Sequence, residues 1–184
     1  MTEQARTSRV LIGLIVSMTL GAIVLIALDN KGGQVKGGTF QLSVYLRHEP
    51  VDKVVFGGLS SRGEWRGIEV YYSQTSGGNA RQLALLSGLT GGQDLNAHFV
   101  ICNGNGGKEG EIERTERWLY QQPCVSSGAW HGSTDTLRIC VVADGVSRMP
   151  TECQKRRTDD LVKELSRSFK IKGNMVIYPV NWRM

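Results

Sequence analysis

Cysteine pairs of the Cys-x-x-Cys type are absent from this chain of 184 residues. Their absence leaves a zinc ribbon and a thiol–disulfide redox motif without support. The chain has four cysteines, namely Cys102, Cys124, Cys140 and Cys153. They allow three disulfide pairings, among which the sequence alone does not choose. Cys102 and Cys140 lie in apolar, strand-like runs, where a buried free thiol is the expected state.

A recognition motif that combines aromatic and basic residues is also missing, and the net charge is only +5. This positive excess is too small and too scattered for a nucleic-acid-binding protein, so we expect no nucleic-acid partner. It suits an anionic partner such as a wall polymer or lipid headgroups. The hydrophobic fraction of 40% predicts a globular protein, long enough for one domain and an appendage.

Charge is absent from the 19 residues Val10–Leu28. A helix of that length crosses a bilayer, so we predict a cytoplasmic tail over 1–9 and a single transmembrane helix over 10–28. Arg6 and Arg9 precede the run, which favours a cytoplasmic N-terminus and places the rest of the chain on the extracytoplasmic side of the cell membrane. A cleaved signal peptide is the alternative, but the run exceeds the usual apolar region and no small-x-small cleavage site follows.

Small residues recur every fourth position within this run, at Gly13, Ser17 and Gly21. They share one helical face, which suggests a homodimer through close helix contact. The alternative is that glycine and serine are simply common in membrane helices.

The segment 29–63 is interpreted as a spacer with strands of uncertain role. Glycine and lysine dominate residues 30–38, which is typical of a flexible linker. Alternating apolar residues predict a strand over Phe40–Leu46, and Val54–Phe56 is a second candidate strand.

From residue 64 onward, β-rich runs alternate with helical patterns. The predicted strands are Ile68–Tyr72, His98–Cys102 with a hairpin return at Glu111–Thr115, Leu137–Val142 and Met175–Tyr178. A short helix is expected over Ala80–Leu86, and a long one opens at a capping box of Thr151 and Gln154. This order predicts an α/β fold with a mixed central β-sheet flanked by helices.

Four segments then occur in a specific order. They are His98-Phe99-Val100-Ile101-x-Asn103-Gly104, Gly110-Glu111-Ile112-Glu113, Arg117-Trp118-x-x-Gln121 and Ile139–Gly145 ahead of Pro150-Thr151. Together they resemble the N-acetylmuramoyl-L-alanine amidase and peptidoglycan recognition protein family. The resemblance covers roughly Trp65 to Trp182 and implies an amidase-like domain over 64–184.

In that family two histidines and a cysteine or aspartate hold a catalytic zinc ion. The resemblance places the first histidine position on Tyr71, the second on Tyr178 and the assisting tyrosine or glutamate on Ala97. The third ligand would follow several residues later, beyond Met184. A neutral phenol is a poor zinc ligand at pH 7, and an alanine is neither acid nor base. The resemblance therefore implies a pseudoenzyme without zinc or another cofactor.

Three other groups of residues are candidates for a substitute site. The family's counterpart of His98 is not a ligand, so packing is the better interpretation of His98 and Cys102. Cys124 and His131 suggest a nucleophile–base dyad, although loop residues or a disulfide explain them better. Glu111 and Glu113 resemble a carboxylate pair but are expected to face solvent. Lys155-Arg156-Arg157 is interpreted as a solvated helix face.

Aromatic residues suggest a groove for sugar rings or stem peptides, with Tyr71, Tyr72, Trp130 and Tyr178 as its lining. Core packing explains Trp65 and Trp118 at least as well. The favoured hypothesis is a membrane-anchored, catalytically inactive amidase-like domain that binds peptidoglycan, a muropeptide or a protein partner. The alternatives are an active amidase with unorthodox ligands and a structural or assembly membrane protein.

Overall fold

The computed structural model of the protein describes residues 16–20, 48–57, 59, 63–88, 95–125, 130 and 132–182. Residues 16–20 are helical and belong to the unit Met1–Thr39, whereas the main unit is Phe40–Met184. No helix within the described ranges is long and apolar enough to cross a membrane. Most of the predicted span 10–28 lies outside those ranges, as do Gly13, Gly21 and the predicted strand over 40–46.

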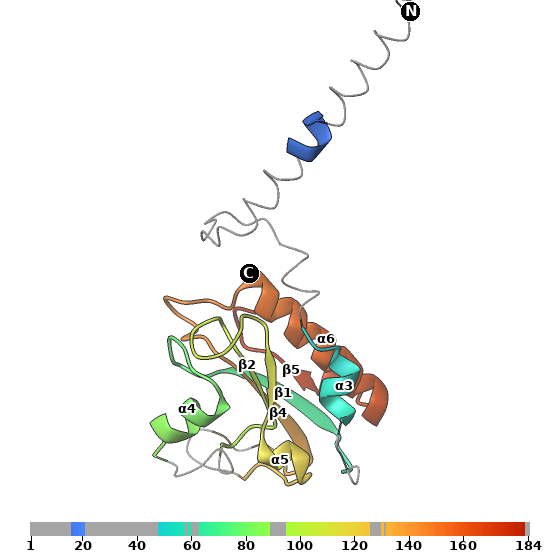
Figure 1. Ribbon diagram of the computed structural model, residues 1–184. Helices are drawn as coiled ribbons and strands as arrows, with labels where there is room; N and C mark the ends of the chain where they lie inside the picture. Colours follow the sequence, from blue (N-terminus) through green and yellow to red (C-terminus); the bar gives the residue numbers. More distant parts are fainter. Residues whose placement is uncertain are drawn as a thin grey trace, which may run out of the picture. The chain divides into compact units, whose positions relative to one another are not determined.

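Five strands of the described main unit form one mixed sheet (Figure 1). They are β1 (Gly67–Tyr72), β2 (Phe99–Ile101), β3 (Ile112–Arg114), β4 (Thr136–Val141) and β5 (Val176–Ile177), in the order β3-β2-β4-β1-β5. β2, β4, β1 and β5 run parallel, and β3 pairs antiparallel with β2 as its hairpin partner. The predicted strands from residue 64 onward and the mixed sheet are thus confirmed.

The described helices of the main unit are α3 (Val51–Phe56), α4 (Ala80–Leu86), α5 (Glu116–Leu119) and α6 (Glu152–Phe169), and a 3-10 turn, η2, covers Gly173–Met175. α6 begins at the predicted capping box, in which Thr151 Oγ1 accepts from the Gln154 N–H at 3.1 Å. The Gln154 Oε1 atom accepts in turn from the Thr151 N–H at 3.0 Å. α4 has an equivalent box between Asn79 and Gln82.

The prediction of a strand at Val54–Phe56 is wrong, because these residues form the second half of α3. A short apolar run has no period that separates a strand from a buried helix turn. Val54 and Val55 are buried in the main core, and α3 contacts α6 and β3. The Trp118 indole N–H donates to the Val55 carbonyl at 2.9 Å, so this part of the segment 29–63 belongs to the domain.

Each face of the sheet carries its own core, because successive strand residues point to opposite faces. On one face, α3 and α6 cover a large core, with α3 beside α6 in Figure 1. Its buried strand residues are Ile68, Val70, Phe99, Ile101, Ile112, Leu137, Ile139 and Val141. On the other face, Leu83 and Ala84 of α4 pack in a smaller core with Val100, Cys102, Cys140 and Val142. We call these the α6 face and the α4 face.

Candidate functional site

An arginine lies on the α4 face in the middle of β4, among the apolar residues Leu137, Ile139, Cys140 and Val141. Arg138 is only 7% exposed, and the parallel register of β1 with β4 sets it opposite Glu69. Its Nε atom donates to Glu69 Oε2 at 3.0 Å, and its Nη1 atom donates to the Asn96 carbonyl at 2.7 Å. A buried guanidinium is tolerated only with such partners, so these contacts fix its position.

Two aromatic rings contact the same guanidinium. The Arg138 Cζ atom lies 4.1 Å from the centroid of the Tyr71 ring and 4.5 Å from that of Trp130. Both distances fall within cation–π range. The Tyr71 hydroxyl donates to the Asn96 carbonyl at 3.4 Å, and burial and the neighbouring Cys140 raise its pKa well above the usual range. Tyr71 is therefore a neutral phenol beside a fixed cation.

All four cysteines are free and buried. Burial raises the pKa of Cys140 to about 12 and that of Cys124 to about 11, and it also raises the pKa of Cys102 and Cys153. Since the thiolate is the nucleophile and the metal ligand, these thiols are unreactive at neutral pH.

His98 is fully buried, which supports its interpretation as a packing residue. Its Nδ1 atom accepts from the Arg138 N–H at 3.0 Å, so the proton is on Nε2, which donates to the Gln122 carbonyl at 3.1 Å. Burial lowers the pKa of His98 to about 3. Cys124 Sγ lies 3.6 Å from its Nδ1 atom, but both nitrogens are already engaged. His131, the expected base for Cys124, lies outside the described residues.

The structure separates the positions at which the family resemblance places zinc ligands. Tyr71 and the buried Ala97 border the α4-face core, whereas Tyr178 packs on the α6 face. There the Tyr178 hydroxyl donates to Asp159 Oδ1 at 3.2 Å, and its ring lies 5.4 Å from that of Trp182. The two tyrosines thus point away from each other across the sheet.

The four candidate groove residues divide in the same way. Tyr71 and Trp130 contact Arg138 on the α4 face. Tyr72, the next residue of the strand, packs on the α6 face with Tyr178, and its ring lies 6.3 Å from that of Trp182. The four residues therefore form two pairs on opposite faces of the sheet and do not line one groove. All four tryptophans are buried, as core packing requires.

The side chains around Tyr71 do not fit a zinc ion. The fixed charge of Arg138 repels a divalent cation at this position, and the nearby thiols hold their protons. Within the described part of the chain, no group of three or more histidine, cysteine, aspartate or glutamate side chains is arranged to hold a metal.

One interpretation of a charged residue needs correction. Glu113 and Glu111 are half-buried, and each accepts a hydrogen bond from a backbone N–H. Glu113 Oε2 accepts from the Ala80 N–H at 2.7 Å, and Glu111 Oε2 accepts from the Lys108 N–H at 2.8 Å. Arg157 is only 4% exposed, so a solvated helix face is wrong at this residue.

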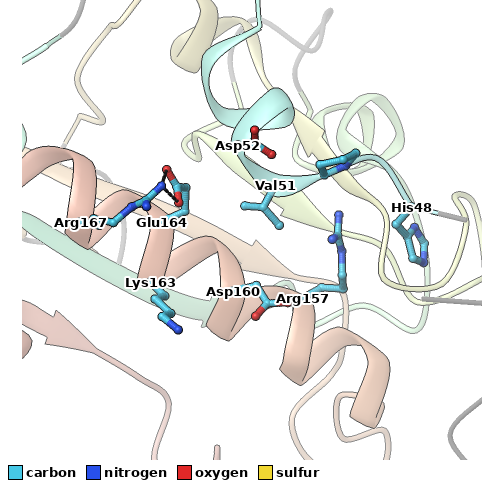
Figure 2. Close-up of a pocket in the computed structure, with 9 residues that line it drawn as sticks. His48, Val51, Asp52, Arg157, Asp160, Lys163, Glu164 and Arg167 are labelled. Carbon is cyan, nitrogen blue, oxygen red and sulfur yellow. Dashed lines mark hydrogen bonds and ion pairs between the residues drawn. The ribbon is translucent and has the colours of Figure 1, made fainter. Parts of the chain in front are cut away.

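Arg157 also forms part of a groove of about 620 Å³ between α3 and α6 (Figure 2). The lining residues are His48, Pro50, Val51, Asp52, Arg157, Asp160, Lys163, Glu164 and Arg167. Arg157 donates to the Gly110 and Glu49 carbonyls, and Arg167 pairs with Glu164 at 2.8 Å. The α6 wall therefore presents charges of both signs, while α3 adds Asp52 and an apolar edge.

A second hollow of about 410 Å³ lies between α4 and the turn of the β2–β3 hairpin. It is lined by Ser76, Gly77, Gly78, Gln82, Leu85, Leu86, Asn105 and Gly106. None of these eight residues is charged, in contrast to the groove between α3 and α6.

Sequence reasoning missed Arg138 and both hollows. A single charge in an apolar strand is a signal for Arg138, but its partner lies in a strand 69 residues earlier. No protein-family model matches the chain, and a comparison with curated proteins gives no match either.

Proposed function

We propose that the chain is a catalytically inactive, amidase-like domain that binds peptidoglycan or its fragments outside the cell membrane, to which residues 10–28 anchor it. The observation that carries the proposal is the buried guanidinium of Arg138 in front of Tyr71. The Arg138 guanidinium, a cation that belongs to the protein, lies beside the position at which the resemblance implies a metal ligand.

Loss of hydrolysis follows from the groups around Arg138. Cleavage of an amide requires an activated water and a group that protonates the leaving amine. Tyr71 is a neutral phenol, Ala97 carries no acid or base, and both ring nitrogens of His98 are hydrogen-bonded. The same facts count against the alternative of an active amidase with ligands recruited from His98 and the cysteines.

Binding is supported by the groove between α3 and α6. A peptidoglycan stem peptide carries carboxylates and, in many wall types, an amine. Lys163 and Asp52 offer one charge of each sign on opposite walls of the groove. Such exposed charges set orientation and specificity more than affinity, so we expect weak binding that many copies of the ligand on a wall polymer reinforce.

Co-sedimentation with purified, protein-free peptidoglycan tests this proposal. The full chain in a zwitterionic detergent is expected to pellet with the polymer, and Lys163→Glu should weaken its retention several-fold at low salt because the groove becomes net acidic. Lys172→Glu is the matched control, since Lys172 is exposed and lies outside the groove. A chain that stays in the supernatant at every salt concentration would refute the proposal.

A further inference from the structure

The turn of the β2–β3 hairpin contains both Asn-Gly sequences of the chain, Asn103-Gly104 and Asn105-Gly106. In such a sequence the backbone nitrogen of the glycine is able to attack the asparagine side chain, because glycine has no Cβ atom that hinders the approach. Asparagine is accordingly among the thermally labile residues of proteins. Gly104 and Gly106 have φ angles of 90° and 105°, so both occupy the region of positive φ that glycine tolerates. The sequence alone therefore gives the two asparagines similar reactivity.

The fold holds the Asn103 side chain at both ends of its amide. Its Nδ2 atom donates to the Ser76 carbonyl at 3.1 Å, and its Oδ1 atom accepts from the Asn105 N–H, also at 3.1 Å. Attack on the Cγ atom makes this planar amide tetrahedral and then expels Nδ2, which breaks the bond to Ser76 and displaces Oδ1. Asn103 is also half-buried. The two hydrogen bonds therefore protect Asn103.

Asn105, two residues later, lacks this restraint. It is exposed, and its side-chain amide makes no hydrogen bond within the described part of the chain. The Gly106 N–H, which is the attacking group, likewise has no acceptor among the described residues. Gly106 is exposed as well, so water reaches both reacting groups and is able to carry protons to and from them.

We propose that Asn105 is a site of spontaneous deamidation in the folded protein, whereas Asn103 is protected. The Gly106 nitrogen forms a bond to the Asn105 Cγ atom, the Cγ–Nδ2 bond breaks, and ammonia leaves with the proton that the Gly106 nitrogen loses. One water molecule then opens the resulting succinimide at either carbonyl. The products are aspartate and isoaspartate, in which the main chain runs through Cβ and Cγ. Water is the only co-reactant, no group is oxidised or reduced, and no ligand of the domain takes part.

Isoaspartate at position 105 would disrupt the contact between the hairpin turn and the start of α4. The Gly78 N–H donates to the Asn105 carbonyl at 2.6 Å, and the side chain of Asn79, the N-cap of α4, donates to the Gly106 carbonyl at 3.0 Å. In isoaspartate the former Asn105 carbonyl becomes a free carboxylate, and the main chain gains a methylene group. Gly106 has no space to shift, since a Cβ atom there would come within 2.8 Å of the Gly78 Cα atom. We therefore expect that the two bonds do not survive together and that the first turn of α4 loosens.

Ageing of the full chain in a zwitterionic detergent tests the site. The chain is incubated in a mildly alkaline buffer made with water enriched in heavy oxygen, which labels each newly opened ring, and its peptides are mapped by mass spectrometry. In the folded chain the label should accumulate several-fold faster at Asn105 than at Asn103. In urea the two rates should become similar, because the bonds that protect Asn103 are lost. Faster or equal labelling of Asn103 in the folded chain, or no label at Asn105, would overturn the proposal.

Asn105→Gln is the matched variant, because its longer side chain keeps the amide but would have to close a larger ring, which forms far more slowly. This variant should take up no label at position 105. Limited trypsin digestion then tests the effect on α4. The aged chain should be cut after Arg81, in the first turn of α4, several-fold faster than fresh chain, while cleavage after the exposed Lys172 stays the same. The aged variant should be cut like fresh chain, and equal cutting after Arg81 in aged and fresh chain would overturn the loosening of α4.

Discussion

At the scale of single residues, Arg138 and His98 are buried polar side chains with defined hydrogen-bond partners. Arg138 joins β4 to β1 through Glu69, while His98 accepts from the backbone N–H of Arg138. Burial keeps the His98 imidazole neutral, since its pKa is lowered. The interior can therefore be tested by substitution at Arg138 and by pH at His98.

Replacing Arg138 with leucine should destabilise the fold by about 2 to 3 kcal/mol, because Glu69 and the Asn96 carbonyl lose a charged donor. The measurement is the free energy of unfolding from urea denaturation. Arg66→Leu is the matched control, since Arg66 forms an exposed ion pair with Asp135 and should cost less than about 1 kcal/mol. Equal losses in the two variants would contradict the buried ion pair.

Stability should fall when the pH drops from 7 to 5, because of His98. Its pKa is lowered to about 3 in the folded state, so the unfolded chain, with a pKa near 6.5, binds more protons in this window. The stabilising contribution is complete above about pH 6.5 and is lost progressively as the pH falls toward 3. We expect a loss of about 2 kcal/mol between pH 7 and 5. His98→Gln should remove most of this slope, and an unchanged slope would contradict the assignment.

At the scale of elements, the N-terminal turn of α6 connects the helix to two strands. The Gln154 Nε2 atom donates to the carbonyls of Ile101 and Val142, both at 3.1 Å, where β2 and β4 end. The same side chain closes the capping box through its Oε1 atom. One residue thus satisfies the start of the helix and the carboxyl ends of two parallel strands.

Gln154→Leu should therefore destabilise the protein by about 2 to 3 kcal/mol, because the Val142 and Ile101 carbonyls both lose a donor and the cap is weakened. The Ile101 carbonyl keeps its bond from the Val142 N–H. Gln82→Leu is its control in thermal unfolding, because Gln82 holds the same position in the capping box of α4 and its side chain makes no hydrogen bond to a strand within the described residues. Its expected cost is below about 1 kcal/mol. A similar melting temperature for both variants would refute the bridging role of Gln154.

The sequence predicted helices and strands correctly where the hydrophobic period and the capping or turn residues indicate the same element. The capping box at Thr151 and the β-rich runs at His98–Cys102 and Glu111–Thr115 are local signals, and the helix and the hairpin appear at these positions. α3 was mistaken for a strand because three apolar residues carry no period. The site was less predictable, since the pairing of β1 with β4 joins residues far apart in sequence. That pairing, and not any motif, brings Glu69, Tyr71 and Arg138 together.

At the scale of the whole molecule, the sheet separates Tyr71 from Tyr178, the two positions at which the family resemblance places zinc-binding histidines. Tyr71 lies in β1, and Tyr178 directly follows β5, the parallel neighbour of β1. The two side chains nevertheless contact the cores on opposite faces of the sheet. Restoring histidine at both positions should consequently fail to create a zinc site. For Tyr71→His with Tyr178→His, metal analysis after zinc addition and dialysis should give no stoichiometric zinc. One zinc ion per chain would show that the two positions can converge.

We propose that Arg138 takes the place of a metal and that the domain binds peptidoglycan without cleaving it. The most direct test is to incubate the full chain with purified peptidoglycan and added zinc, then to pellet the polymer and measure released stem peptides. We expect the chain in the pellet and no more stem peptide in the supernatant than in a protein-free control. Zinc-dependent release that rises with the amount of chain would contradict it.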